Sequence, residues 1–240
     1  MLQQTQANRV AIRFKALIKQ YPSIVQLAQA TNKEILTLWS GLGYNRRALY
    51  LVQSAKIILH QYKGKIPSEL SELIQLPGVG VYTAGAIRAF GCNLWGIFLE
   101  TNIRTVLIHH LFQKSRNKIS DQILSQHLVA INHIVQKQLP SARTWYSHLM
   151  DYGAELKSQG VQINNQTKNY IKQKPFQGSN RQMRGAIIRA LTNNHTLSQT
   201  NLHSILNAKS KLHQSKIAYC LAALTREGMI SARRDRYRIL

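Results

Sequence analysis

The strongest constraint on the fold is a short segment with two glycines, Leu76-Pro77-Gly78-Val79-Gly80. Apolar residues recur at helical spacing on both sides of it, which predicts helices over residues 69–75 and 81–90. Proline and closely spaced glycines favour a tight hairpin between these helices. Glycines also leave backbone N–H groups uncovered at the positive end of the second helix, an arrangement that binds a phosphate oxygen. We therefore predict a helix-hairpin-helix that contacts phosphate through Pro77, Gly78, Val79, Gly80 and Thr83. A plain turn between two helices is the alternative.

Helical spacing covers most of the remaining chain. It predicts helices within residues 7–62, with a break at Gly41, Gly43 and Asn45, and over residues 101–113, 121–138, 141–157, 181–193, 198–207 and 213–227. A strand pattern occurs only from Met229 onward, around Arg233-Arg234-Asp235-Arg236. We expect a mostly α-helical protein with a core domain over 1–157, a polar linker over 158–180 and a basic, winged-helix-like domain over 181–240. A plain helical appendage is the alternative for the last part.

The charge balance points to a polyanionic partner. Lys and Arg number 32 against 9 Asp and Glu, a formal net charge of +23. Such a surplus opposes compaction by self-repulsion, and nucleic acid is the partner that it favours. The basic residues are spread along the chain and not along one amphipathic face, which argues against a membrane surface. The sequence has neither an apolar run of 18 residues nor the form of a signal peptide, so we expect an intracellular, cytoplasmic protein.

Several segments resemble the adenine DNA glycosylases, the MutY type of the helix-hairpin-helix (HhH-GPD) superfamily of base-excision glycosylases. These segments read MLQQTQ at residues 1–6, LWSGLGYNRR at 38–47, LPGVGVYTAGAI at 76–87, LETNIRTVL at 99–107 and LMDYGA at 149–154. The spacing from the hairpin to Glu100 agrees with the family without a gap. The resemblance covers about residues 1–157. It implies a two-lobed glycosylase fold with a cleft, and a monomer that acts on double-stranded DNA containing a mismatch or damaged base.

Glu100 is the leading candidate for catalysis among the nine carboxylates. It alone follows a long apolar stretch, residues 94–99, and leads into a new helix. Burial makes an unpaired carboxylate costly, so a function is expected there, with helix capping as the alternative. The resemblance places Glu100 on the family's catalytic aspartate, which stabilises positive charge on the deoxyribose as the base leaves. Glutamate is one methylene longer, which favours electrostatic stabilisation over covalent capture.

The resemblance assigns three neighbours of this carboxylate. Asn102 and Arg104 match family positions near the carboxylate and the DNA strand; a contact at the helix start and ordinary helix surface are the alternatives. Tyr82 stands where the strand-cleaving members carry the lysine that forms a Schiff base. Tyrosine cannot form one, so we expect base excision without strand cleavage by that route.

The resemblance also assigns DNA contacts in the first part of the chain. Gln3 and Gln4 match residues that enter the duplex beside the flipped base, where amides can bond an unpaired base edge, and Leu2 matches an apolar wedge. Tyr44, Arg46 and Arg47 follow a glycine-rich bend, and we expect them to stack on or clamp the strand. Core packing is the alternative for Tyr44.

Three departures from the family pattern change what we expect. The family's general acid, a glutamate, lies just upstream of the MLQQTQ segment, so we expect this chain to lack it and to release adenine slowly. The family's four iron–sulfur cysteines would fall between about residues 157 and 173, yet the only cysteines are Cys92 and Cys220. We therefore expect no cluster, no metal and no other cofactor. We also expect the winged-helix-like unit to stand in place of the family's C-terminal domain, which reads 8-oxoguanine.

Three functions stay open on the sequence. The first is a monofunctional DNA glycosylase that excises adenine opposite guanine or 8-oxoguanine. The second is a thymine or uracil mismatch glycosylase, which Tyr82 also suits. The third is a catalytically weak protein that binds damaged DNA on the same scaffold.

Overall fold

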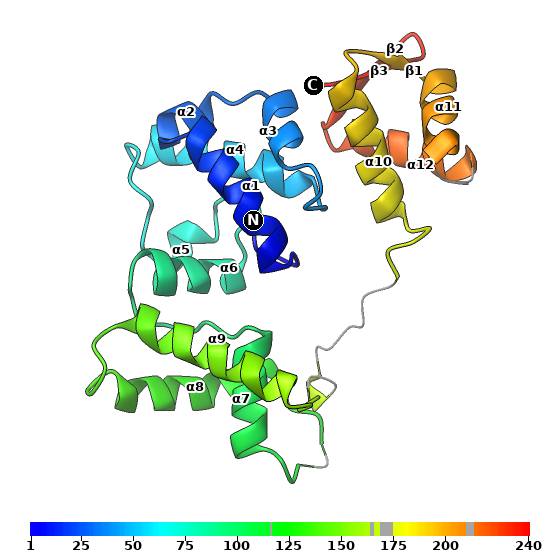
Figure 1. Ribbon diagram of the computed structural model, residues 1–240. Helices are drawn as coiled ribbons and strands as arrows, with labels where there is room; N and C mark the ends of the chain where they lie inside the picture. Colours follow the sequence, from blue (N-terminus) through cyan, green and yellow to red (C-terminus); the bar gives the residue numbers. More distant parts are fainter. Residues whose placement is uncertain (116, 164–165, 169–174, 210–213) are drawn as a thin grey trace. The chain divides into compact units, whose positions relative to one another are not determined.

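The computed structural model describes residues 1–115, 117–163, 166–168, 175–209 and 214–240. Their contacts define two compact units, one made of Met1–Ile66 with Lys174–Leu240 and the other of Pro67–Gln173. Each unit has its own hydrophobic core. Most of the described elements are helices, as the helical spacing predicted (Figure 1).

The first unit begins with four helices, α1 (Ala7–Gln20), α2 (Ile24–Ala28), α3 (Asn32–Leu38) and α4 (Arg46–Gln61). Ser23 and Thr31 form capping boxes that start α2 and α3, because each side chain accepts the backbone N–H three residues on. The bend before α4 uses the left-handed region at Gly41 (φ +91°) and Gly43 (φ +71°). Tyr44 also has a positive φ, +48°, although it is not glycine, and it is therefore strained.

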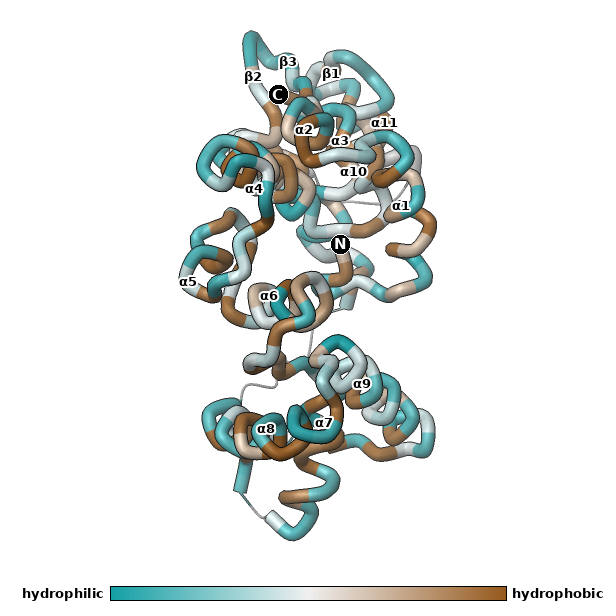
Figure 2. Tube along the Cα trace, turned by 90° about the vertical axis from the view of Figure 1, so that its left-hand side faces the viewer, coloured by the Kyte–Doolittle hydropathy of each residue, from teal (hydrophilic) through white to brown (hydrophobic). Residues whose placement is uncertain are grey.

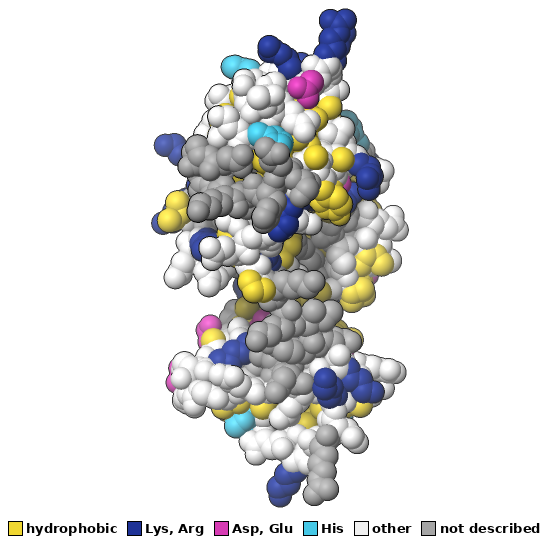
Figure 3. Space-filling view, turned by 90° about the vertical axis from the view of Figure 1, so that its right-hand side faces the viewer, with side chains coloured by type: hydrophobic (Ala, Val, Ile, Leu, Met, Phe, Trp, Pro, Cys, Tyr) yellow, Lys and Arg dark blue, Asp and Glu magenta, His cyan; other side chains and the backbone are white. Residues whose placement is uncertain are grey.

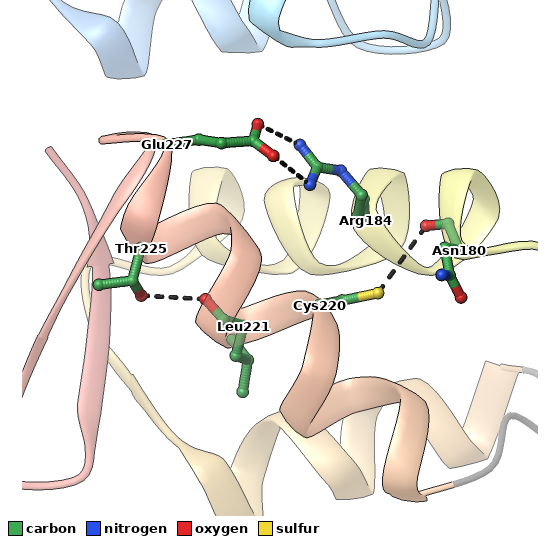
Figure 4. Close-up of polar contacts among 6 residues, drawn as sticks. All are labelled: Asn180, Arg184, Cys220, Leu221, Thr225 and Glu227. Carbon is green, nitrogen blue, oxygen red and sulfur yellow. Dashed lines mark hydrogen bonds and ion pairs between the residues drawn. The ribbon is translucent and has the colours of Figure 1, made fainter.

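The same unit ends in a winged helix, which confirms that part of the expected fold. It consists of α10 (Asn180–Asn193), β1 (Leu197–Ser198), α11 (Gln199–Lys209), α12 (Gln214–Arg226), β2 (Ile230–Arg233) and β3 (Arg236–Ile239). The three strands form an antiparallel sheet in the order β1-β3-β2. Arg184 on α10 binds Glu227, just after α12, through two contacts of 2.6 and 2.7 Å (Figure 4). The sequence pattern missed β1 because two residues are too few to show alternation.

The winged helix shares one core with the first helices. Met183 and Ile187 of α10 are fully buried in the same cluster as Ile35 and Leu36 of α3. Contacts therefore group the chain differently from the expected division at residues 157 and 181. The division into independently folding domains stays a prediction, and part of the expected linker lies outside the described residues.

The second unit holds the hairpin and the helices after it. They are α5 (Leu70–Leu73), α6 (Val81–Ala86), the π-helix η1 (Ile87–Gly91), α7 (Thr101–Leu111), α8 (Asp121–Val135) and α9 (Ala142–Ser158). Brown apolar and teal polar stretches alternate along α8, as expected of a helix with one face in a core (Figure 2). The core lies between α7, α8 and α9 around Ile103, Leu124 and Tyr146.

The second unit is almost entirely helical. The described residues before 180 contain no strand, only an isolated bridge between Ile119 and Thr167. Residues 166–168, within the expected linker, therefore pack against the second unit. None of the described helices is both long and apolar enough to span a membrane.

Candidate functional site

The hairpin is formed as its sequence predicted. Gly78 takes a positive φ of +73°, and Gly80 takes an extended conformation (φ −93°, ψ 178°) as the residue that caps α6. The Ala84 N–H donates to the Gly80 carbonyl at 2.9 Å, which closes the first turn of the helix. Apart from its chain neighbours, no atom lies within 4 Å of a Cβ built at Gly80, so a side chain at this position would enter open space.

A second glycine ties the hairpin helix to the segment before Glu100. A Cβ at Gly85 would lie 2.3 Å from the Ile97 carbonyl oxygen, so only glycine allows α6 to approach this closely. The ring of Tyr82, on the same helix, lies 5.5 Å from the ring of Phe98. The hairpin helix and the segment that ends at Glu100 are thus packed against each other.

Glu100 lies at the start of α7 with 8% of its surface exposed. Its Oε1 accepts a hydrogen bond from the Asn102 backbone N–H at 2.6 Å. This is the helix-capping geometry that the sequence left open as the alternative to catalysis. The two roles are compatible, because a carboxylate has about four acceptor positions on two oxygens.

The side chain of Asn102 is held by a residue that the sequence analysis did not single out. Lys157, in the last turn of α9, donates from Nζ to the Asn102 Oδ1. Burial lowers the pKa of the Lys157 ammonium, and the negative charge of Glu100 acts in the opposite direction. The sequence offered only a weak signal for Lys157, the four-residue spacing from Gly153 on one face of a helix.

The charges of Glu100 and Arg104 act on the hydroxyl group of Tyr82. Partial burial raises the pKa of its hydroxyl, the charge of Glu100 raises it further, and Arg104 lowers it. The phenol therefore stays protonated at neutral pH and can donate a hydrogen bond. Arg104 itself pairs with Asp121 through contacts of 3.0 and 2.9 Å between guanidinium and carboxylate. Its expected contact with the DNA strand stays a prediction.

In the first unit, Arg47 organises the N-terminal segment that carries Gln3 and Gln4. Its guanidinium donates to the carbonyls of Met1 (2.8 Å) and Gly43 (2.9 Å), to the Thr5 hydroxyl (2.8 Å), and also to Gln3 and Leu42. These bonds fix the start of the chain against the glycine-rich bend, with Leu2 63% exposed. Sequence reasoning took Arg47 for a strand contact and missed this anchoring.

Tyr44 is exposed and stacked with arginines, so the core-packing alternative is wrong. Its ring lies 5.7 Å from the guanidinium carbon of Arg47 and 5.5 Å from that of Arg181, whose Nη1 donates to the tyrosine hydroxyl at 2.8 Å. Arg46 is exposed on α4 and lies over the Tyr50 ring. An aromatic ring among cations at a surface can receive either a phosphate or a base.

The structure therefore brings the expected site residues into two groups. Tyr82, Glu100, Asn102, Arg104 and the hairpin belong to the second unit, and the N-terminal glutamines with Tyr44, Arg46 and Arg47 belong to the first. On the face drawn in Figure 3, Lys and Arg side chains occur at scattered places from top to bottom, and Asp and Glu occur at fewer.

A four-thiolate iron–sulfur cluster does not fit this chain. The sequence holds two cysteines, of which Cys92 belongs to the second unit and Cys220 is buried in the first. Four cysteines in one place are needed to bind such a cluster. Among the described residues, no group of three or more His, Cys, Asp or Glu could hold a metal ion.

The family follows from the match of the chain to known proteins. The model of the "HhH-GPD superfamily base excision DNA repair protein" matches residues 1–131, more than half of the 240 residues. The chain belongs to this superfamily. The match includes the hairpin, Tyr82, Glu100 and Asn102, and so covers the group in the second unit.

Relatives within the HhH-GPD superfamily carry the name adenine DNA glycosylase. The protein of Buchnera aphidicola subsp. Baizongia pistaciae is 35% identical over 183 residues, which cover 74% of this chain and 51% of that protein. The protein of Mycolicibacterium smegmatis is 37% identical over 107 residues, which cover 45% and 36%. The chain spans about half the length, or less, of the curated relatives it matches.

A solved structure supports the fold. The structure of a thermostable thymine-DNA glycosylase superposes with a TM-score of 0.52 and 22% identity, covering 70% of this chain and 79% of that one. Together with the family match, this confirms the mostly helical, helix-hairpin-helix glycosylase fold.

Proposed function

We propose that this chain is a monofunctional DNA glycosylase that removes a mispaired base, adenine opposite guanine or 8-oxoguanine, by hydrolysing its N-glycosidic bond. The observation that carries the proposal is Glu100, a buried carboxylate at a helix start, in a chain of the HhH-GPD superfamily. The name shared by the relatives supports adenine as the base.

The chemistry requires charge stabilisation at the sugar. As the C–N bond breaks, positive charge develops on the deoxyribose, and a nearby carboxylate lowers the energy of this oxocarbenium-like state. The base leaves with the bonding electron pair, water adds to the sugar carbon, and the proton that this water loses balances the charge of the released base. Glu100 is the group that we assign to this stabilisation, and Tyr82 and Asn102 are assigned to contacts with the extruded nucleotide.

Strand cleavage through a Schiff base is not part of the proposal. The position that carries a lysine in the strand-cleaving members of the family is Tyr82, and a phenol cannot condense with the sugar aldehyde. The protonated Tyr82 hydroxyl can instead donate a hydrogen bond to an oxygen of the DNA.

A panel of duplexes tests the assignment of the base. Under single-turnover conditions with the protein in excess, base release should be measured from A opposite 8-oxoguanine, A opposite G, T opposite G and U opposite G. Release from the two adenine duplexes alone supports the proposal. Release of thymine or uracil instead would make it a pyrimidine mismatch glycosylase, and binding to every duplex without any release would make it a damage-binding protein.

The affinity for DNA should depend steeply on salt. The hairpin and the basic surface both act on phosphates, and neutralising about 6–10 phosphates lowers affinity by roughly 10³–10⁵-fold between about 50 and 200 mM salt. Duplexes of different sequence should behave alike. Titration of a labelled undamaged duplex at several salt concentrations measures the slope, and a binding constant indifferent to salt would contradict the assignment.

Gly80→Leu should weaken binding to all duplexes by about tenfold or more, since a hydrogen bond to a charged phosphate contributes roughly 1.5–3 kcal/mol. The backbone angles of Gly80 suit any residue and its surroundings are open, so the variant should fold and obstruct only the approach of phosphate. Gly185→Leu is the matched control, because it also adds a side chain into open space, on α10. Equal affinities for the two variants would count against the hairpin as the phosphate site.

We also propose that the protein binds no iron. The purified protein should be colourless, with less than one iron per chain, because its two cysteines lie in different units. Elemental analysis and the visible absorption spectrum measure this directly. About four irons per chain with cluster-like absorbance would overturn it.

A further inference from the structure

Asn102 is fixed from three sides. Its backbone N–H donates to Glu100, its side-chain Oδ1 accepts from Lys157, and its backbone lies against Gly153 of α9. A Cβ at Gly153 would lie 2.2 Å from the Asn102 carbonyl oxygen and 2.8 Å from its Cβ. Gly153 and Lys157 are four residues apart and therefore face the same side of α9. Because Gly153 has no side chain, α9 can lie close to the backbone of Asn102. This close approach places Lys157 within hydrogen-bond distance of the Asn102 side chain.

The contact with Lys157 decides which way the amide of Asn102 points. An ammonium group donates hydrogen bonds and accepts none, so only the amide oxygen can face it. The planar amide then turns its NH2 group to the other side of Cγ. Within the described part of the chain, no acceptor is bonded to this NH2 group.

We propose that Lys157 is a positioning residue that makes Asn102 present its NH2 group to an oxygen acceptor of the DNA backbone at the extruded nucleotide. The inference rests on the proposed function, because it assumes that the damaged nucleotide is bound beside Glu100. Under this proposal, the two residues at the start of α7 have different roles. Glu100 stabilises the transition state, while Asn102 contributes to binding of the extruded nucleotide before any bond breaks.

Lowered pKa and partial burial of Lys157 agree with a structural partner and not with a freely solvated lysine. One hydrogen bond of the ammonium goes to Asn102, so Lys157 has a partner within the protein that a freely solvated lysine lacks. The effect of removing it should therefore differ from the effect of removing a solvated lysine, which weakens binding to all DNA alike.

Binding to a duplex with a tetrahydrofuran abasic analogue, compared with an undamaged duplex, tests the inference without any base release. The full chain and the variants Lys157→Met, Lys157→Arg and Asn102→Asp should be compared at one salt concentration. Lys168→Met is the matched control, since it removes an exposed lysine of the same unit and the same charge. We expect the preference for the abasic analogue to fall about tenfold in Lys157→Met and Asn102→Asp. It should be kept in Lys157→Arg and Lys168→Met.

The double variant Lys157→Met with Asn102→Asp should lose no more preference than Asn102→Asp alone, because Lys157 acts only through the NH2 group that Asn102→Asp removes. A Lys157→Met protein that keeps the full preference while Asn102→Asp loses it would overturn the inference, as would strictly additive losses. If circular dichroism shows that Lys157→Met does not fold, Asn102→Asp and Lys157→Arg still test the inference. Equal losses of the preference for the abasic analogue in these two variants would overturn it. Absence of base release by the full chain would count against the proposed function alone, because this readout measures binding.

Discussion

Glu100→Gln is expected to abolish base release while leaving the affinity for mismatched DNA nearly intact. Glutamine keeps an oxygen that can accept from the Asn102 N–H, so the helix start should survive the change. What is lost is the negative charge, which acts only when positive charge develops on the sugar. The loss of such electrostatic stabilisation lowers the rate by about 10²–10³-fold or more. Single-turnover release from A opposite 8-oxoguanine measures the rate, and titration of the same duplex measures the affinity.

Glu155→Gln is the matched control for this experiment. Glu155 is an exposed carboxylate of the second unit that accepts a hydrogen bond from Gln159, the residue that caps the end of α9. Its change removes one negative charge from the same unit, and we expect the rate of base release to stay within about twofold. If Glu100→Gln releases the base as fast as the parent chain, Glu100 is only a helix cap and the catalytic assignment is wrong.

The second large effect is expected from Gly153→Ala, which should destabilise the second unit. The added methyl group would lie 2.2 Å from the Asn102 carbonyl oxygen and 2.6 Å from its carbonyl carbon. These atoms belong to backbone, so α7 and α9 must move apart, and overpacking of this kind costs about 1–3 kcal/mol, occasionally more. The midpoint of thermal unfolding should fall by roughly 4–8 °C for each kcal/mol. The preference for the abasic analogue should fall as well, because Asn102 moves.

Gly185→Ala is the matched control, because it adds the same methyl group and should not lower the stability. No atom lies within 4 Å of a Cβ at Gly185, in the middle of α10. Alanine is favoured over glycine inside a helix by about 0.5–1 kcal/mol, so the variant should be as stable as the parent chain or slightly more so. Calorimetry of the two variants measures the difference. Equal unfolding midpoints would contradict the close approach of α7 and α9 at Gly153.

Much of the fold follows from features that neighbouring residues share. The spacing of apolar residues predicted helices over 101–113 and 121–138, and α7 and α8 lie inside these ranges. It also predicted α9 to within one residue at each end. Gly78 and Gly80 predicted the hairpin, since the backbone conformation of a tight turn is a property of the residues in it. The apolar stretch before Glu100 predicted the burial of its carboxylate in a similar way, because the apolar residues must pack and Glu100 directly follows them.

Local sequence patterns were therefore enough to predict the helices, the hairpin, the winged helix apart from β1, and the carboxylate at the start of α7. Tertiary structure alone decided that Arg47 bonds Met1, 46 residues away, that Arg104 pairs with Asp121, 17 residues away, and that Lys157 bonds Asn102, 55 residues away. It also decided that α10 joins the core of the first helices. The physical reason is distance along the chain. A helix or turn is stabilised by residues a few positions apart, whereas a contact between distant side chains forms only once packed helices have placed both ends.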